Sequence, residues 1–336
     1  MNDLGQMLQI GGQPMVLRDV APTDRDDVLA LHQRVFGAPV DAAWFNWKYV
    51  QGGGEGVGLW HNGEMIAHCG GVPRKLWHAG ALQRDLQIGD VMVAPEWRGI
   101  LTRRGPFFHV SKRLYDTRLG RGRPFFAGFG FPSARHLELA VKAGLLWRSG
   151  VMTGLQWGAG APEKALSHWR WRVSALQPES PAFDAAVNCA WDRMRAQTKG
   201  LLIGERDAAY VRWRYLQRPA HDHVFLQLLR PWQRRPLGLA VLARVTAGQP
   251  AHWLDWLGPP ELLAQACAMC RTEAAHLGAT GMTVWASQAV LARLSDTGIA
   301  SQAEVAHIGV PTTSAVAPDL VATLDWWFMG GDTDFL

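Results

Sequence analysis

The sequence lacks several features that mark special classes of protein. Its 336 residues include only four cysteines, too few for a disulfide framework, so we expect a reducing, cytoplasmic location. No stretch reaches the roughly 18 uninterrupted apolar residues of a membrane-spanning helix, and the first residues lack a basic signal-peptide start, so we expect no membrane partner. Charged residues make up 19% and hydrophobic residues 48%, which excludes a disordered polymer and indicates a globular protein.

Signatures of metal and nucleic-acid binding are missing as well. Cys267 and Cys270 form a CxxC, but no second Cys/His pair lies at ligand spacing, so we expect helix packing and no metal site. There is no helix-turn-helix, zinc-finger or RNP signature, and nucleic acid is not an expected partner. The net charge of +5 suits a smaller anionic ligand such as a nucleotide cofactor.

An internal repeat divides the chain. The segment DAAWFNWKYVQ at 41–51 recurs as DAAYVRWRYLQ at 207–217, and Asp90 of GDVMVAPEW matches Asp255 of LDWLGPPEL. The offset is 166 at the first block (207 − 41), 165 at the second (255 − 90) and 154 at a third (287 − 133), so the second copy has lost 11 residues before the third block. We therefore expect domains at 1–157 and 185–336, joined by a linker at 158–184 that is rich in Gly, Ala and Pro.

The pattern of the first copy alternates between strands and helices. A hairpin is expected over 56–72, because two apolar runs flank the turn signal Asn62-Gly63. The other expected elements are a strand at 15–20, a helix from about Thr23, a helix at 41–50, a strand at 85–93, a helix at 101–119, a strand at 124–131, a helix at 133–143 stopped by Gly144, and a strand at 145–157. This order predicts a mixed α/β fold in each copy, with a mostly antiparallel central sheet flanked by helices.

That order, together with the block V-x-P-x-x-R-G at Val93 to Gly99, resembles the GNAT superfamily of acyl-CoA N-acyltransferases. The block GFPSARHLELAVKAGL at 130–145 is similar to a second coenzyme-contacting segment of that family. The resemblance spans most of 15–157, whereas in 186–336 it rests mainly on the repeat. It implies acetyl-CoA or another acyl-CoA as donor, with the pyrophosphate held by backbone N–H groups at a helix N-terminus. The coenzyme-binding residues it implies are Val91, Met92, Val93, Arg98, Gly99, Ile100, Leu101, Thr102, Arg103, Arg104, Gly105 and Ser133.

The sequence departs from the family pattern at two places. Leu101 and Arg103 stand where the usual loop has small residues, and a Cβ there obstructs close approach to phosphate unless the loop is rebuilt. Ala140 stands where many members carry a tyrosine as general acid. Proton delivery to the leaving thiolate must therefore come from elsewhere, or does not occur.

The candidate catalytic residues are Asp90 and His136. A carboxylate near the end of the 85–93 strand could deprotonate the acceptor, and a histidine titrates in the right range, as do His61 and His68. For Asp90 an architectural hydrogen bond is an equal alternative, because Asp255 repeats it in a copy without the coenzyme loop. Candidate substrate-binding residues are Trp47 and two aspartates of the C-terminal tail, Asp332 and Asp334.

The leading interpretation is acyl transfer from coenzyme A to an amine of a small molecule, saccharide or peptide. Two alternatives stay open. One is a catalytically silent GNAT fold that serves binding or assembly, favoured by Ala140 and the irregular loop. The other is a tandem-GNAT peptidyl transferase that uses aminoacyl-tRNA. The acceptor, the acyl chain length and the oligomeric state cannot be read from the sequence.

Overall fold

The computed structural model describes residues 5–78, 80–99, 105–160, 166–220 and 222–333. The chain forms two compact units that are not contiguous in sequence. Unit 1 contains Met1–Lys75, Gln83–Ser149 and His307–Thr323. Unit 2 contains Leu76–Leu82, Gly150–Ala306 and Leu324–Leu336. Each unit therefore includes segments from both halves of the chain.

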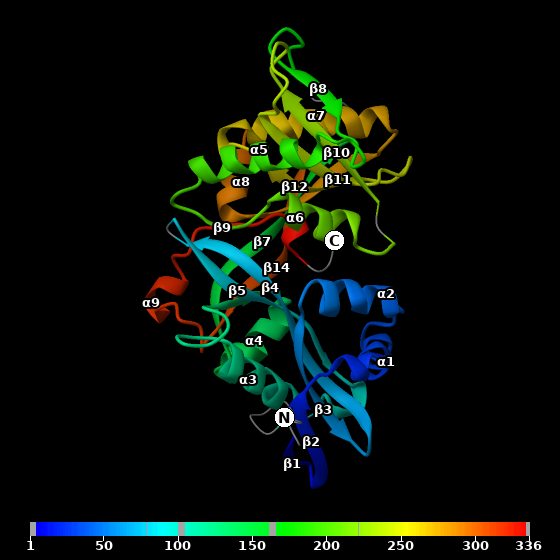
Figure 1. Ribbon diagram of the computed structural model, residues 1–336, viewed down its shortest axis with the longest axis vertical. Coiled ribbons are helices and arrows are strands. Elements are labelled where there is room, and N and C mark those ends of the chain that lie inside the picture. The colour runs from blue at the N-terminus through cyan, green and yellow to red at the C-terminus, as the bar shows by residue number, and fades with distance from the viewer. Residues whose placement is uncertain (1–4, 79, 100–104, 161–165, 221, 334–336) are drawn as a thin grey trace. The chain divides into compact units, whose positions relative to one another are not determined.

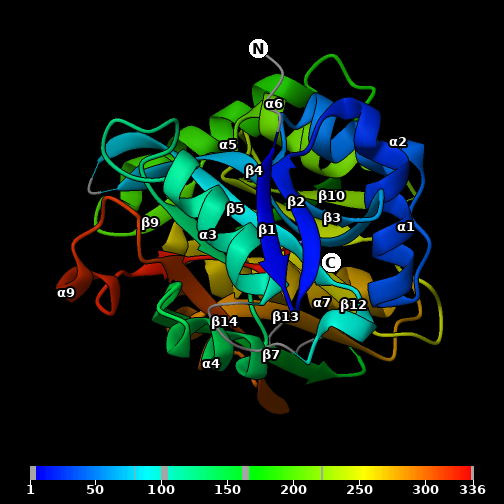
Figure 2. The same cartoon turned by 90° about the horizontal axis from the view of Figure 1, so that it is seen from below.

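Unit 1 is a mixed sheet with helices. Its elements are β1 (Gln6–Ile10), β2 (Gln13–Asp19), α1 (Arg25–Phe36), α2 (Ala42–Phe45), β3 (Glu55–His61), most of β4 (Glu64–His78) and β5 (Ala81–Val93), α3 (Pro106–Arg118), β6 (Gly128–Gly130), α4 (Ala134–Lys142), the start of β7 (Leu146–Gly158), the end of β14 (Ser301–Pro311) and α9 (Pro318–Val321). Figures 1 and 2 show α1 and α2 on one side of β3 and β4, with α3 and α4 on the other.

Unit 2 is built in the same way. Its elements are the rest of β7, β8 (Arg172–Ala175), α5 (Phe183–Gln197), β9 (Leu202–Gly204), α6 (Ala208–Val211), β10 (His223–Leu229), β11 (Gly238–Ala243), β12 (Ala251–Leu257), α7 (Leu263–His276), β13 (Gly281–Ser287), α8 (Gln288–Leu294), the start of β14, β15 (Trp326–Trp327) and a 3-10 helix, Gly330–Asp332.

The strand pairing repeats between the units. In unit 1, β1 to β4 pair antiparallel, β5 pairs parallel with β6, and β6 meets β14 antiparallel at Gly130 and Gly309. In unit 2, β8, β10, β11 and β12 pair antiparallel, β12 pairs parallel with β13, and β13 pairs antiparallel with β7. The mixed α/β fold expected from the sequence is confirmed, and the comparable pairing agrees with two copies of one fold.

The repeated block also folds the same way twice. Asp41 caps α2 by accepting a hydrogen bond from the Trp44 amide at 2.9 Å, and Asp207 caps α6 through the Tyr210 amide at 2.8 Å. Each short α-helix then widens into a π-helical turn, at Asn46–Gln51 and at Arg212–Leu216. The segment expected as a helix over 41–50 is helical, but from Asn46 onward it is a π-helix, which the sequence did not indicate.

Other local expectations were partly wrong. Strand β1 was not expected, although Gly11 and Gly12 supply the positive φ angles of its turn into β2. The helix expected from Thr23 begins at Arg25 after a 3-10 turn. Of the strand expected over 124–131, only Gly128–Gly130 forms a regular strand, β6, although the Phe126 amide already bonds to the Arg84 carbonyl of β5 at 2.8 Å.

Two local expectations hold, for the hairpin turn and for the helix that carries the two cysteines. The hairpin turn has positive φ at Asn62 (50°) and Gly63 (82°), as the turn signal requires. Cys267 and Cys270 are free thiols buried on α7, and burial raises the pKa of Cys267 to about 12. In the described ranges no group of three potential metal ligands comes together. None of the helices described is long and apolar enough to span a membrane.

Candidate functional site

The end of β5 extends beyond its pairing with the short strand β6. The parallel register runs from Leu86 opposite Gly128 to Ile88 opposite Gly130, whereas β5 continues to Val93. The backbone of residues 89–93 therefore has no ladder partner on β6 among the residues described. Unpaired amides on a strand are hydrogen-bond donors available to a ligand.

Asp90 lies in this open section and has a left-handed backbone, with φ of 49°. Such a conformation is uncommon and costly for a residue with a side chain, so neighbouring contacts must hold it. His68 provides one, because its Nδ1 lies 2.8 Å from the Asp90 carbonyl oxygen. Since a carbonyl can only accept, Nδ1 carries the proton of this imidazole.

The Asp90 carboxylate is bound at both oxygens. Lys48 Nζ lies 2.9 Å from Oδ1, and the Tyr49 hydroxyl donates to Oδ2 at 2.5 Å. The side chains of Lys48 and Asp90 are only 4% and 8% exposed. Burial disfavours the charged carboxylate, but the Lys48 ammonium and the Tyr49 hydroxyl outweigh it and hold the pKa of Asp90 below its usual value. The Asp90 carboxylate is therefore ionised, and each of its oxygens accepts a hydrogen bond.

His68 is completely buried beside this pair. Burial lowers the pKa of His68 below the ordinary 6.5, and its Nε2 has no hydrogen-bond partner in the described part of the chain. Two glycines make room for it. A Cβ at Gly56 would lie 2.6 Å from His68 Nε2, and one at Gly70 would lie 2.5 Å from the Tyr49 hydroxyl oxygen. These glycines are needed for the close approach of imidazole and phenol.

A second cluster forms where α3 and α4 begin. Gly105 is the N-cap of α3 and Pro106 its first residue, while Ser133 caps α4 by accepting from the His136 amide at 3.4 Å. The rings of Phe107 and His136 meet edge to face at 5.0 Å, which brings the two helix N-termini together. Both ends expose amide donors and carry partial positive charge. Burial lowers the pKa of His136, so its imidazole is neutral at pH 7.

The side chain of Arg98 is hydrogen-bonded to the end of β5. Its Nε donates to the Val93 carbonyl at 2.9 Å while the side chain stays exposed. The remaining guanidinium N–H groups make no hydrogen bond within the described residues, so they can reach an anion.

The other expected site residues are distributed as follows. Met92 is buried, Val91 and Val93 are half-buried, and Gly99 is exposed. Trp47 is buried in the fold at 5% exposure. Ile100, Leu101, Thr102, Arg103, Arg104 and Asp334 lie outside the described residues.

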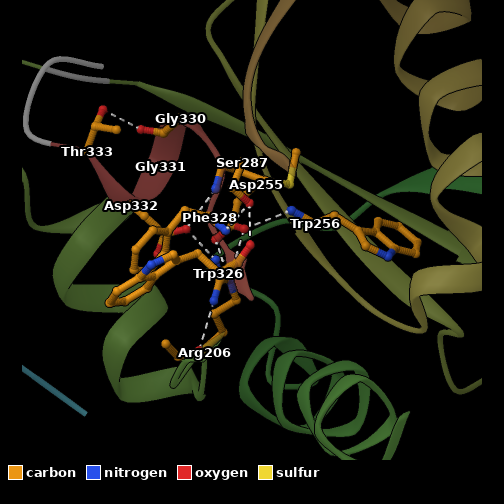
Figure 3. Close-up of polar contacts among 12 residues, drawn as sticks. Arg206, Asp255, Trp256, Ser287, Trp326, Phe328, Gly330, Gly331, Asp332 and Thr333 are labelled. Carbon is orange, nitrogen blue, oxygen red and sulfur yellow. Dashed lines mark hydrogen bonds and ion pairs between the residues drawn. The ribbon is translucent and has the colours of Figure 1, made fainter. Parts of the chain in front are cut away.

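Asp332 is fully buried in unit 2, in a network that Figure 3 shows. Arg206 Nη2 lies 2.5 Å from Asp332 Oδ2, and Arg206 Nε lies 2.9 Å from Asp255 Oδ1. The Tyr215 hydroxyl donates to Asp255 at 2.9 Å, which repeats the Tyr49–Asp90 bond of unit 1. A Cβ on Gly331 would lie 2.0 Å from that hydroxyl, so the C-terminal segment packs directly on the pair.

Lys48 and Tyr49 were not predicted as partners of Asp90, because the sequence of 41–50 indicated only a helix. The repeat contained the information needed to predict the Tyr49–Asp90 contact. Tyr49 matches Tyr215 in the same alignment that matches Asp90 to Asp255, and in both units these two residues are hydrogen-bonded. A contact kept in both copies supports the architectural alternative for the aspartate.

Comparison with known proteins agrees with this geometry. Residues 16–135 match the family model of the acetyltransferase (GNAT) domain. A conserved protein of Enterococcus faecalis V583, described as a probable N-acyltransferase, is similar in structure, with a TM-score of 0.66 and 11% identity over 90% of this chain and 73% of that one. A GCN5-related N-acetyltransferase of Kribbella flavida gives 0.60 and 18%, over 88% and 70%.

A more distant likeness extends to Saccharomyces cerevisiae N-myristoyltransferase with bound myristoyl-CoA, with a TM-score of 0.54 and 10% identity over 91% of this chain and 84% of that one. At these identities the solved structures show the fold alone. No protein with a curated description matches the sequence.

Proposed function

This chain belongs to the GNAT superfamily, and from that premise we propose that it transfers an acyl group from an acyl-CoA to an amine. The observation that carries the proposal is the open end of β5, whose Val91 and Val93 pack against the same core as Phe107 at the start of α3. Together the strand end and the helix start offer a row of backbone donors next to a positively polarised end, which suits a thioester continued by a pyrophosphate.

The described residues provide groups suited to both the thioester and the pyrophosphate of the coenzyme. The amides of residues 91–93 would polarise the thioester carbonyl, and the first turn of α3 with Arg98 would hold the pyrophosphate. In the reaction the acceptor nitrogen bonds to the acyl carbon and the carbon–sulfur bond breaks. The nitrogen loses a proton and the leaving thiolate gains one.

We assign different parts to the two candidate catalytic residues. Asp90 is bound at both oxygens, so it acts as a positioning group that fixes Lys48 and Tyr49 beside the open strand. His136 is neutral and its ring nitrogens make no hydrogen bond to the described residues, so it can accept the proton of the acceptor amine. Replacing His136 with Gln should then lower turnover and remove the acid limb of the pH–rate profile.

Calorimetric titration with coenzyme A tests the binding part of the proposal. We expect one site per chain, and Arg98→Ala should weaken it by roughly 1–3 kcal/mol, the usual value of hydrogen bonds to a charged group. Arg244→Ala, which removes an exposed arginine of unit 2, is the matched control and should leave the affinity unchanged. Failure of the wild-type protein to bind acetyl-CoA or longer acyl-CoAs would overturn the proposal.

A silent binding module is the second candidate, because Ala140 is fully buried and packs in the core of unit 1. The position that carries an acid in many GNAT enzymes therefore offers no proton here. The acyltransferase and the silent module can be distinguished by measuring the release of free coenzyme A thiol from an acyl-CoA in the presence of a panel of amines. Coenzyme binding without release for any amine would favour the module.

A further inference from the structure

Unit 2 carries a surface rich in tryptophan and arginine that acyl transfer does not use. It consists of Trp169, Trp232 and the five arginines of segments 168–172 and 230–235, and we refer to it as the Trp–Arg surface. The side chains of Trp169 and Trp232 are 69% and 74% exposed, more than any other large hydrophobic residue described. Indoles exposed to this extent are unusual, because a folded chain normally covers them.

The two segments are held together as one surface. Strand β8 ends the strand order beside β10, as Figure 1 shows, and Arg172 lies opposite Leu229 in their register. Arg172 also donates to the Gln233 carbonyl at 3.1 Å, and Arg230 to the Arg170 carbonyl at 3.4 Å. The two segments therefore lie side by side at the β8 edge of the unit, and the surface continues through Arg234 and Arg235 to the hollow beside α5.

The charge of this surface is not balanced by its own residues. The stretches 166–175 and 229–237 contain no aspartate or glutamate, and none of their five arginines forms an ion pair within the described residues. Asp192 of α5 lines the same hollow as Arg234 and Arg235, but its ion pair is with Arg195, so the positive charge of the surface remains in excess. The surface therefore attracts a polyanion over a distance of about one Debye length.

The aromatic geometry distinguishes between two kinds of polyanion. Arg230 stacks over the ring of Trp171 at 4.2 Å, and Arg170 approaches Trp169 at 5.8 Å, so guanidinium groups take up ring faces that a nucleobase would need for stacking. An anionic bilayer needs no free ring face. Indoles locate at the headgroup level and arginines beside them contact lipid phosphates, and Val173, 39% exposed on β8, adds apolar area.

We propose that the Trp–Arg surface docks the protein on an anionic lipid bilayer, with Trp169 and Trp232 inserted at headgroup depth. This revises the expectation of no membrane partner, because that expectation rested on the lack of a spanning helix, and surface docking needs none. The proposal does not depend on the acyl-transfer activity.

Flotation of the full chain with vesicles tests it. Binding should occur with equal parts of phosphatidylcholine and phosphatidylglycerol and not with phosphatidylcholine alone. The double change Trp169→Ala with Trp232→Ala, and separately Arg170→Gln with Arg234→Gln and Arg235→Gln, should each reduce the fraction bound at least roughly fivefold. Brominated lipid should quench the tryptophan fluorescence of the wild type and not of the double tryptophan variant.

Phe36→Ala with Arg121→Gln and Arg123→Gln is the matched control, since it removes an exposed aromatic residue and two exposed arginines from unit 1. It should bind vesicles as the wild type does. Equal binding to both lipid mixtures, no binding to either, or an equal loss in the control would overturn the proposal. Binding of polyuridylate alone, lost in the same variants, would assign the surface to nucleic acid instead.

Discussion

The two copies of the repeat keep a tyrosine–aspartate hydrogen bond and differ in the cation and the chain segments that contact it. In unit 1 the Tyr49–Asp90 pair meets a lysine from the adjacent position, and the strand beyond it stays open. In unit 2 the Tyr215–Asp255 pair meets Arg206 from another segment, and the C-terminal residues pack over it. The comparison indicates that the tyrosine–aspartate bond belongs to the fold, whereas the surroundings decide whether a copy can bind a ligand.

The pKa values of the two aspartates also differ between the units. The pKa of Asp90 is lowered, since its lysine and tyrosine outweigh burial. For Asp255, burial and the second carboxylate, Asp332, raise the pKa despite Arg206. Arg206 therefore compensates two fully buried carboxylates at once, so we expect the stability of unit 2 to depend strongly on it.

The largest expected effect comes from removing that arginine. Arg206→Leu removes the cation that binds both buried carboxylates, Asp255 and Asp332, and should lower the free energy of unfolding by about 3–5 kcal/mol, measured by urea denaturation. The control Arg244→Leu breaks the exposed pair with Asp222 and should cost less than about 1 kcal/mol. Equal effects of the two changes would contradict the central role of Arg206.

The next effect compares the two tyrosines directly. Tyr49→Phe and Tyr215→Phe each remove a hydrogen bond to a buried carboxylate and should each cost about 1.5–3 kcal/mol of stability. Only Tyr49→Phe should also lower the rate of thiol release, because only unit 1 has the open strand. A loss of activity in the folded Tyr215→Phe variant would mean that unit 2 contributes to catalysis.

A smaller effect is expected at the contact between the C-terminal segment and unit 2. Gly331→Ala places a Cβ 2.0 Å from the Tyr215 hydroxyl and 3.0 Å from the Leu254 carbonyl, so the segment must shift at a cost of about 1–3 kcal/mol. Gly200→Ala, with nothing within 4 Å of its added Cβ, is the control and should be nearly neutral. Unchanged melting temperatures for both variants would show that the segment is not tightly packed.

The smallest effect at neutral pH concerns His68. Burial lowers the pKa of His68 in the folded protein below 6.5, its value in the unfolded chain. Between these two pKa values the unfolded chain binds more protons than the folded one. The free energy of unfolding therefore decreases as the pH drops below 6.5. His68→Asn keeps a donor for the Asp90 carbonyl and removes the titration. Melting curves should therefore fall less steeply below pH 6.5 for the variant, and a parallel fall would exclude His68 as a source.

Local sequence determined much of the fold. The repeat specified two copies of one architecture, and its caps at Asp41 and Asp207 appear in both. The Asn62-Gly63 turn and the end of α4 before Gly144, whose φ is 74°, were also readable, because positive φ angles depend on residue type. These features need only neighbouring residues, so the sequence carries them.

Contacts between distant residues were decided only by the tertiary structure. Lys48 and Asp90 are 42 positions apart, and Arg206 and Asp332 are 126 apart, with no local pattern linking either pair. Asp332 was predicted to bind substrate, yet the apolar Trp326, Trp327 and Phe328 carry it into the core of unit 2, where it pairs with Arg206. Composition identified these charges, but only packing determined which of them are buried together, because burial depends on the whole chain.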